Sequence, residues 1–286
     1  MENMDMEMNK SKVPLWVKLY RSISPFLYYH VITLVVQVPI AVYYMYKALE
    51  YAGSNEELYM GYYTQSITDN TMLILAVAAL TNLPVMILLM KYDRKKIQVW
   101  EEWPHIVNQS PGKVIRLLLF AIAYCISLNN IITISGLATL FPEFEEIAEN
   151  IYSSTIFVQI LVVGILVPIV EELLFRGLLY RRMRYYSNVT VAIVISSAIF
   201  GVYHGNVVQA IYAGIMGAAM AYIYEKYRSI LWPILFHMIA NCTSVCLSST
   251  DIGLTLMGNT ITFLVGTLVA TVTAGICLWQ IRKEIC

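Results

Sequence analysis

Charged residues are scarce in this sequence. Asp, Glu, Lys and Arg together make up 13% of the 286 residues, whereas soluble domains contain roughly 25%. Apolar residues account for 58% of the chain, and the mean hydropathy is +0.64. This composition excludes an ordinary soluble domain and predicts a membrane protein that crosses the bilayer several times.

The sequence also lacks net charge, a secretory signal and paired cysteines. Its 19 basic residues balance its 19 acidic ones, so charge gives no reason to expect a nucleic-acid partner. Residues 1–25 have no apolar core followed by a cleavage site, and we expect them to be retained as a cytoplasmic tail. The five cysteines form no CxxC pair, and we interpret them as small buried hydrophobes and not as disulfides.

Apolar segments of membrane-spanning length occur along the rest of the chain. The pattern predicts an all-α fold, a polytopic membrane helix bundle with about eight transmembrane helices. The expected spans are residues 26–48, 71–90, 114–134, 155–176, 189–204, 207–224, 230–248 and 260–281. We divide them into N-terminal helices and loops (26–150), a core that carries the chemistry (155–248) and a C-terminal segment (249–286).

The basic residues indicate the orientation of the bundle. All of the 19 Lys and Arg residues except Lys47 and Arg176 fall at the same ends of the predicted spans. Because basic loops stay in the cytoplasm, both termini are expected to be cytoplasmic, which an even number of spans permits. We expect a multi-pass integral protein of a bacterial cell membrane, in contact with the lipid bilayer.

The most unusual feature is a group of three charged residues, Glu171, Glu172 and Arg176, which directly follows an apolar run that contains Pro168. Each charge at membrane depth costs about 2.5 to 3.5 kcal/mol. On a helix Glu172 and Arg176 stand four residues apart and can pair, while Glu171 points about 100° away. Pro168 should bend this helix one turn before the pair. The simplest alternative is that these charges mark the membrane exit of a spanning helix.

Two further polar clusters lie in apolar segments. One contains Phe200 and His204, and the other places His237 and Asn241 on one helical face. Each histidine alone is most simply a paired bundle residue, and His30 is interpreted as an interfacial one. Together with Glu171 they supply what peptide hydrolysis needs, namely a base for water, groups that polarise it and an oxyanion donor.

Depth is the difficulty for this grouping. At about 1.5 Å per residue, His204 lies roughly 22 Å up the fifth span. That height would place it toward the outer leaflet, so the fifth helix must tilt or begin well below the lipid core.

The three ordered motifs resemble the signature of the CPBP intramembrane protease family, which includes type II CAAX prenyl endopeptidases and bacteriocin-processing or immunity proteins. The motifs are Glu-Glu-x-x-x-Arg at 171–176, Phe-x-x-x-His at 200–204 and His-x-x-x-Asn at 237–241. The resemblance implies an intramembrane metallo-endopeptidase that cuts near the cytoplasmic side. By this resemblance, Glu171 activates the water together with His204. His237 and Asn241 stabilise the oxyanion or help to hold a metal, and Glu172, Arg176 and Phe200 support these residues.

The resemblance also leads us to expect a metal cofactor and a class of substrate. Zinc is the expected divalent metal, with His204 and His237 as candidate ligands, although Asn241 is a poor zinc ligand and a metal-free glutamate mechanism stays open. The expected partner is a peptide or membrane-protein substrate, prenylated or not. The alternatives are a non-catalytic immunity or scaffold protein and a proton-coupled transporter, for which repeats and broken helices would be expected.

Overall fold

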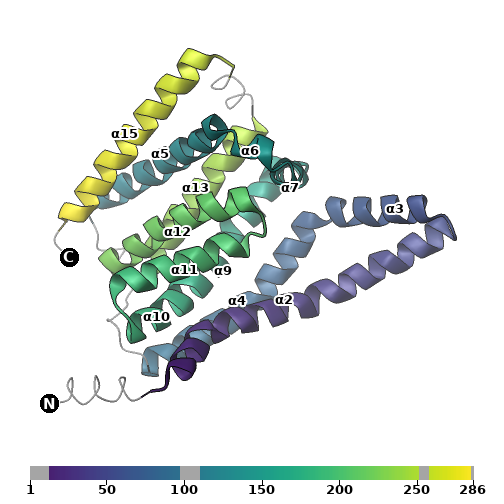
Figure 1. Ribbon diagram of the computed structural model, residues 1–286, viewed down its shortest axis with the longest axis horizontal. Helices are drawn as coiled ribbons and strands as arrows, with labels where there is room; N and C mark the ends of the chain where they lie inside the picture. The colour runs from purple at the N-terminus through teal and green to yellow at the C-terminus, as the bar shows by residue number, and fades with distance from the viewer. Residues whose placement is uncertain (1–12, 97–109, 251–257, 285–286) are drawn as a thin grey trace.

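The fold is a helical bundle in which the residues described contain no strand. The structure is a computed structural model, and it describes residues 13–96, 110–250 and 258–284. Helices α2, α3 and α4 run along one side, and the remaining helices form the body of the bundle (Figure 1). The all-α prediction is confirmed.

The helices follow the chain in a simple order. They are α2 (Leu15–Ala52), α3 (Glu56–Asp69), α4 (Thr71–Lys96), α5 (Pro111–Ser135), α6 (Leu137–Leu140), α7 (Glu143–Tyr152), α8 (Ile156–Gln159), η2 (Ile160–Leu166), α9 (Val167–Glu172), η3 (Leu173–Tyr180), α10 (Arg181–Tyr186), α11 (Val189–Tyr203), α12 (Val207–Tyr227), α13 (Leu231–Ser249) and α15 (Thr260–Lys283). Helix α2 therefore begins well before the expected start of the first span at residue 26.

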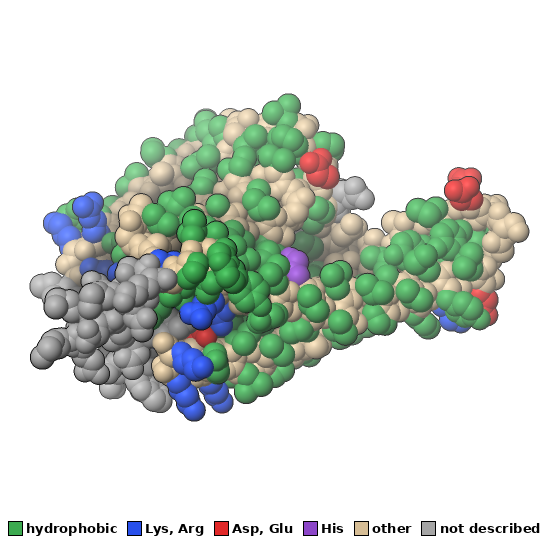
Figure 2. Space-filling view, turned by 60° about the horizontal axis from the view of Figure 1, so that its bottom comes forward, with side chains coloured by type: hydrophobic (Ala, Val, Ile, Leu, Met, Phe, Trp, Pro, Cys, Tyr) green, Lys and Arg blue, Asp and Glu red, His purple; other side chains and the backbone are tan. Residues whose placement is uncertain are grey.

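Seven of the helical segments in the described residues are long and apolar enough to cross a membrane. The remaining expected span, the fifth, is helix α11, which has 15 residues and is shorter than the usual crossing length. Exposed apolar side chains are spread over the visible face of both the body and the arm, which is formed by α2, α3 and α4 (Figure 2). The protein is a multi-pass integral membrane protein, and its fifth apolar segment packs within the bundle as a short helix.

Small residues let α11 lie directly against α12. A Cβ atom built on Gly201 would overlap the backbone oxygen of Ala210, and it would stand 3.2 Å from the Cα atom of Gly214. Neither neighbour is a flexible side chain, so the two backbones could not keep this distance with any larger residue. The contact fixes α11, and with it the end of that helix, against the body of the bundle.

The fourth span is one continuous helical segment from Ile156 to Tyr186. It was expected to end at Arg176, but η3 and α10 carry it ten residues further. The reason is that its arginines are paired inside the protein. Arg182 makes a two-pronged ion pair with Asp93 of α4, at 2.6 and 3.0 Å, so the helix continues where its sequence suggests a membrane exit.

The cysteines follow the prediction in part, since two of the four described are buried and Cys242 is half-buried. All four that the structure describes are free thiols, and Cys125 and Cys277 are buried. Cys246 is exposed on the bundle surface, because α13 turns that side outward. Cys286 lies outside the described residues.

Candidate active site

The site is built on the two places where the fourth span departs from α-helical geometry. Segments η2 and η3 are π-helical, and the short helix α9 between them carries Pro168, Glu171 and Glu172. Turns of π-helix are rare and occur frequently at functional sites. A bend was expected near Pro168, and the structure shows π-helical segments before and after the short helix that carries it.

A side chain from α13 compensates for the missing backbone donor of Pro168. In π geometry the proline nitrogen would face the carbonyl oxygen of Val163, five residues earlier, but it has no hydrogen to donate. Asn241 donates from Nδ2 to that oxygen at 2.9 Å. The asparagine of the third motif therefore ties α13 to the distorted helix and uses one of its two N–H groups to do so.

The buried ion pair at the centre is the one predicted from spacing. Arg176 Nη1 donates to Glu172 Oε1 at 2.7 Å, and the two side chains are 1% and 0% exposed. Arg176 also donates to the carbonyl oxygen of Gly217 at 3.1 Å, and its guanidinium lies 4.4 Å from the ring centre of Phe200. The charge of Glu172 is thus neutralised by a cation that is itself held by α11 and α12.

His237 joins the two glutamates. Its Nδ1 atom lies 2.9 Å from Glu172 Oε1, and its Nε2 atom lies 3.8 Å from Glu171 Oε2. Because an ionised carboxylate only accepts, Nδ1 carries the proton and donates it to Glu172. In the neutral imidazole Nε2 is then an acceptor, and it faces a second carboxylate oxygen beyond direct hydrogen-bond distance.

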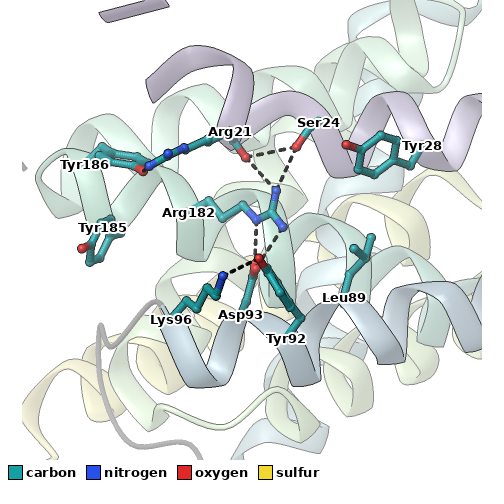
Figure 3. Close-up of a pocket in the computed structure, with 10 residues that line it drawn as sticks. All are labelled: Arg21, Ser24, Tyr28, Leu89, Tyr92, Asp93, Lys96, Arg182, Tyr185 and Tyr186. Carbon is teal, nitrogen blue, oxygen red and sulfur yellow. Dashed lines mark hydrogen bonds and ion pairs between the residues drawn. The ribbon is translucent and has the colours of Figure 1, made fainter. Parts of the chain in front are cut away.

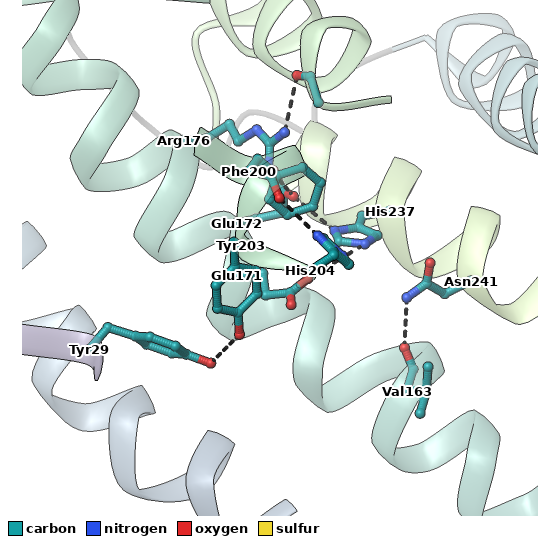
Figure 4. A network of polar contacts seen from close by, with 11 residues as sticks. Tyr29, Val163, Glu171, Glu172, Arg176, Phe200, Tyr203, His204, His237 and Asn241 are labelled. Atoms are coloured by element: carbon teal, nitrogen blue, oxygen red, sulfur yellow. Dashed lines mark hydrogen bonds and ion pairs between the residues drawn. The ribbon is translucent and has the colours of Figure 1, made fainter. Parts of the chain in front are cut away.

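His204 reaches the same place from the end of α11. Its Nδ1 atom lies 2.8 Å from the carbonyl oxygen of Phe200 and donates to it, so Nε2 is again the acceptor. The Phe200 ring packs edge to face against both histidines, with its centre 4.9 Å from that of His204 and 5.8 Å from that of His237. Figure 4 shows His204, His237 and Glu171 turned toward one another.

The extra length of the fourth span removes the difficulty with the depth of His204. Tyr186 lies ten residues beyond Arg176, or about 15 Å further down the helix. From there α11 climbs about 22 Å to His204, which ends about 7 Å above Arg176. Glu171 stands five residues before Arg176, also about 7 Å above it. The structure therefore accounts for the level of His204 by the low start of α11, because the helix before it continues past Arg176.

Residues of α2 border the site, which the motifs did not indicate. Tyr203 shares a hydrogen bond of 2.8 Å with Tyr29. His30, expected at the interface, packs against Phe26 and Tyr203 with ring centres 4.2 and 5.8 Å away. The two tyrosines are 174 residues apart in the sequence. The only sequence signal for this contact was that Tyr203 stands next to His204.

An apolar cavity lies beside this aromatic cluster. It has a volume of about 420 Å³ and is lined by Phe26, His30, Ala198, Ile199, Val202 and Tyr203. In the space-filling view a histidine side chain is visible in the recess where the arm meets the body (Figure 2). The site therefore has an apolar approach between α2 and α11.

The fit of a metal to these residues is incomplete. Both histidines have Nδ1 bonded to an oxygen and Nε2 turned inward, which is the arrangement that metal-binding imidazoles adopt. However, no three His, Cys, Asp or Glu side chains within the described ranges converge closely enough to hold an ion. The catalytic steps below are therefore derived from the side chains alone.

The fold and the site define a multi-pass membrane protein with an acid–histidine centre, which consists of Glu171, Glu172, His204 and His237. A family model described as "Type II CAAX prenyl endopeptidase Rce1-like" matches residues 153–243. The chain is also similar to "Putative membrane peptidase YdiL" of Bacillus subtilis (strain 168), with 32% identity over 83 residues. That match covers 29% of this chain and 34% of the relative's length. No solved structure matches.

The matched region contains all three motifs. Residues 153–243 run from the start of the fourth span to just beyond Asn241, and they include every residue of the acid–histidine centre. The part of the chain that holds the three motifs is thus similar to the Rce1-like family model, as the resemblance in those motifs indicated. Helices α2, α4, α5 and α15 lie outside the matched region.

Proposed function

We propose that this protein is an intramembrane endopeptidase in which Glu171 is the general base. The observation that supports this most strongly is that Glu171 Oε2 and His237 Nε2 face each other across a short gap. The two atoms are buried, 3.8 Å apart and both acceptors. That distance is too long for a direct hydrogen bond and suits a water molecule that donates one hydrogen to each.

The hydrolysis then needs only groups that the site contains. Glu171 takes the proton from the water as its oxygen attacks the carbonyl carbon of the scissile bond, and it later gives that proton to the leaving nitrogen. The second N–H of Asn241, which Val163 does not use, is the donor for the oxyanion. Glu172 holds His237 in the tautomer that accepts at Nε2, and Arg176 holds the Glu172 carboxylate in place through their ion pair.

The substrate side follows from the surroundings of the site. We propose a peptide or membrane-protein substrate that enters through the apolar cavity beside Tyr203, which faces the lipid between α2 and α11. With both termini in the cytoplasm, as the distribution of basic residues predicts, the cut falls toward the cytoplasmic half of the bilayer. The apolar lining accepts a lipid-modified tail as well as an apolar helix.

The test is the variant Glu171→Gln, which keeps the size and polarity of the side chain and removes its basicity. Membrane proteomes of cells with the wild type, Glu171→Gln and the exposed control Glu50→Gln should be compared for uncut precursors. We expect cleavage to fall by about 10²- to 10⁴-fold in Glu171→Gln alone, with normal insertion. Precursors processed equally in all three strains would refute the proposal. A cellular phenotype that survives loss of both His204 and His237 would favour a non-catalytic immunity role.

A further inference from the structure

A second cavity, which is polar, lies at the basic end of the bundle, away from the acid–histidine centre. It has a volume of about 540 Å³, and its lining is Arg21, Ser24, Tyr28, Leu89, Tyr92, Asp93, Lys96, Arg182, Tyr185 and Tyr186. These residues come from the beginning of α2, the end of α4 and helix α10. Figure 3 shows the cations and tyrosines arranged around one space.

One cation of the cavity is committed to the fold. Arg182 is 8% exposed and pairs with Asp93 through Nε and Nη2. Its Nη1 donates to the carbonyl oxygen of Arg21 at 2.7 Å and to Ser24 Oγ at 2.9 Å. Arg182 therefore joins α10 to α2 and α4, and it neutralises the one carboxylate in the cavity lining.

The other two cations keep their charge available. Arg21 and Lys96 are exposed, and their side-chain partners are the hydroxyl groups of Tyr186, at 3.3 Å, and Tyr92, at 2.7 Å. Within the described part of the chain, neither has a carboxylate at ion-pair distance. The lining thus carries two uncompensated positive charges beside neutral hydroxyl groups.

We propose that this cavity binds a phosphate group, and specifically the phosphodiester headgroup of an anionic membrane lipid. Two cations and several hydroxyls match a phosphate oxygen set. The position also fits, because the cavity lies where three helices end among the basic residues that predict the cytoplasmic side. Basic pockets between spanning helices on that side are typical sites for anionic headgroups. This binding does not depend on whether the protein cleaves peptides.

The test is a titration of the purified full-length protein in a neutral detergent, read by native mass spectrometry. The ligands are dioctanoyl phosphatidylglycerol, dioctanoyl phosphatidylcholine and inorganic phosphate. The variant is Arg21→Gln with Lys96→Gln, which leaves Arg182 and its contacts unchanged. The matched control is Arg282→Gln with Lys283→Gln, two exposed cations at the end of α15.

We expect phosphatidylglycerol to bind the wild type and the control pair equally, and the Arg21 and Lys96 variant about 30-fold more weakly. This corresponds to about fivefold for each cation, or about 1 kcal/mol. Inorganic phosphate that displaces phosphatidylglycerol would support the same site with free phosphate as its ligand. Equal affinity in the variant, or equally tight binding of phosphatidylcholine, would overturn the proposal.

Discussion

Removal of Arg176 tests whether the centre of the site is one coupled network. The variant Arg176→Met keeps most of the length and apolar contact area of the side chain. It removes the cation from Glu172, which is 0% exposed, and the donor from the Gly217 carbonyl oxygen. It also removes the guanidinium that lies 4.4 Å from the centre of the Phe200 ring.

The structure sets the size of the effect. Breaking a buried ion pair by removing one partner leaves an uncompensated charge and costs about 3 to 5 kcal/mol. Replacing both partners removes that charge, so the double variant Glu172→Gln with Arg176→Met should recover about 1 to 3 kcal/mol relative to the sum of the single changes. The amide oxygen of glutamine can still accept from His237 Nδ1.

The assay is equilibrium unfolding in mixed micelles for the wild type, both single variants and the double variant. Arg184→Met is the matched control, because its pair with Glu225 is longer, at 3.3 Å, and 29% and 20% exposed. Such partly exposed pairs contribute less than about 1 kcal/mol. Single-variant costs that simply add, or an Arg176→Met cost no larger than the control, would refute the reasoning.

The packing, the ligand geometry and the charge distribution each give one further prediction. Gly201→Ala should separate α11 from α12 and lower both stability and cleavage, whereas Gly275→Ala, which has open space around it, should change neither; equal melting temperatures would contradict this. Because no third His, Cys, Asp or Glu among the described residues lies close enough to hold an ion with His204 and His237, cleavage should persist after removal of metal by a chelator; loss that zinc restores would reinstate the zinc expectation. A single cysteine at Ser54 in a cysteine-free background should react with an impermeant maleimide from outside intact cells, and one at Gly112 only after lysis; the reverse pattern would invert the orientation.

Much of the site could be predicted because its partners are close in sequence. The four-residue spacing of Glu172 and Arg176 predicted their pairing, and the structure confirms it at 2.7 Å. The same spacing put His237 and Asn241 on one face, and both contact the fourth span. Helical periodicity is sufficient for such predictions, since it fixes which side chains share a face before any tertiary contact forms.

The level of His204 and the contribution of α2 could not be predicted in this way. The sequence predicted that the fourth span ends at Arg176, and the pairing of Arg182 with Asp93, 89 residues away, belongs to the helix that continues beyond it. The pair of Tyr29 with Tyr203 likewise depends on how the arm packs against the body. Contacts between distant segments leave no local sequence pattern. The depth of His204 was therefore estimated with the fourth span ending at residue 176, whereas the helix continues to Tyr186.

The most direct test of the central claim is a single turnover of a peptide substrate in water enriched in ¹⁸O. If Glu171 acts as a general base, one ¹⁸O atom should appear in the new carboxylate of the peptide product and none in the Glu171 side chain. The variant Glu171→Gln should give almost no labelled product. Label in Glu171, or product from Glu171→Gln at the wild-type rate, would contradict the mechanism.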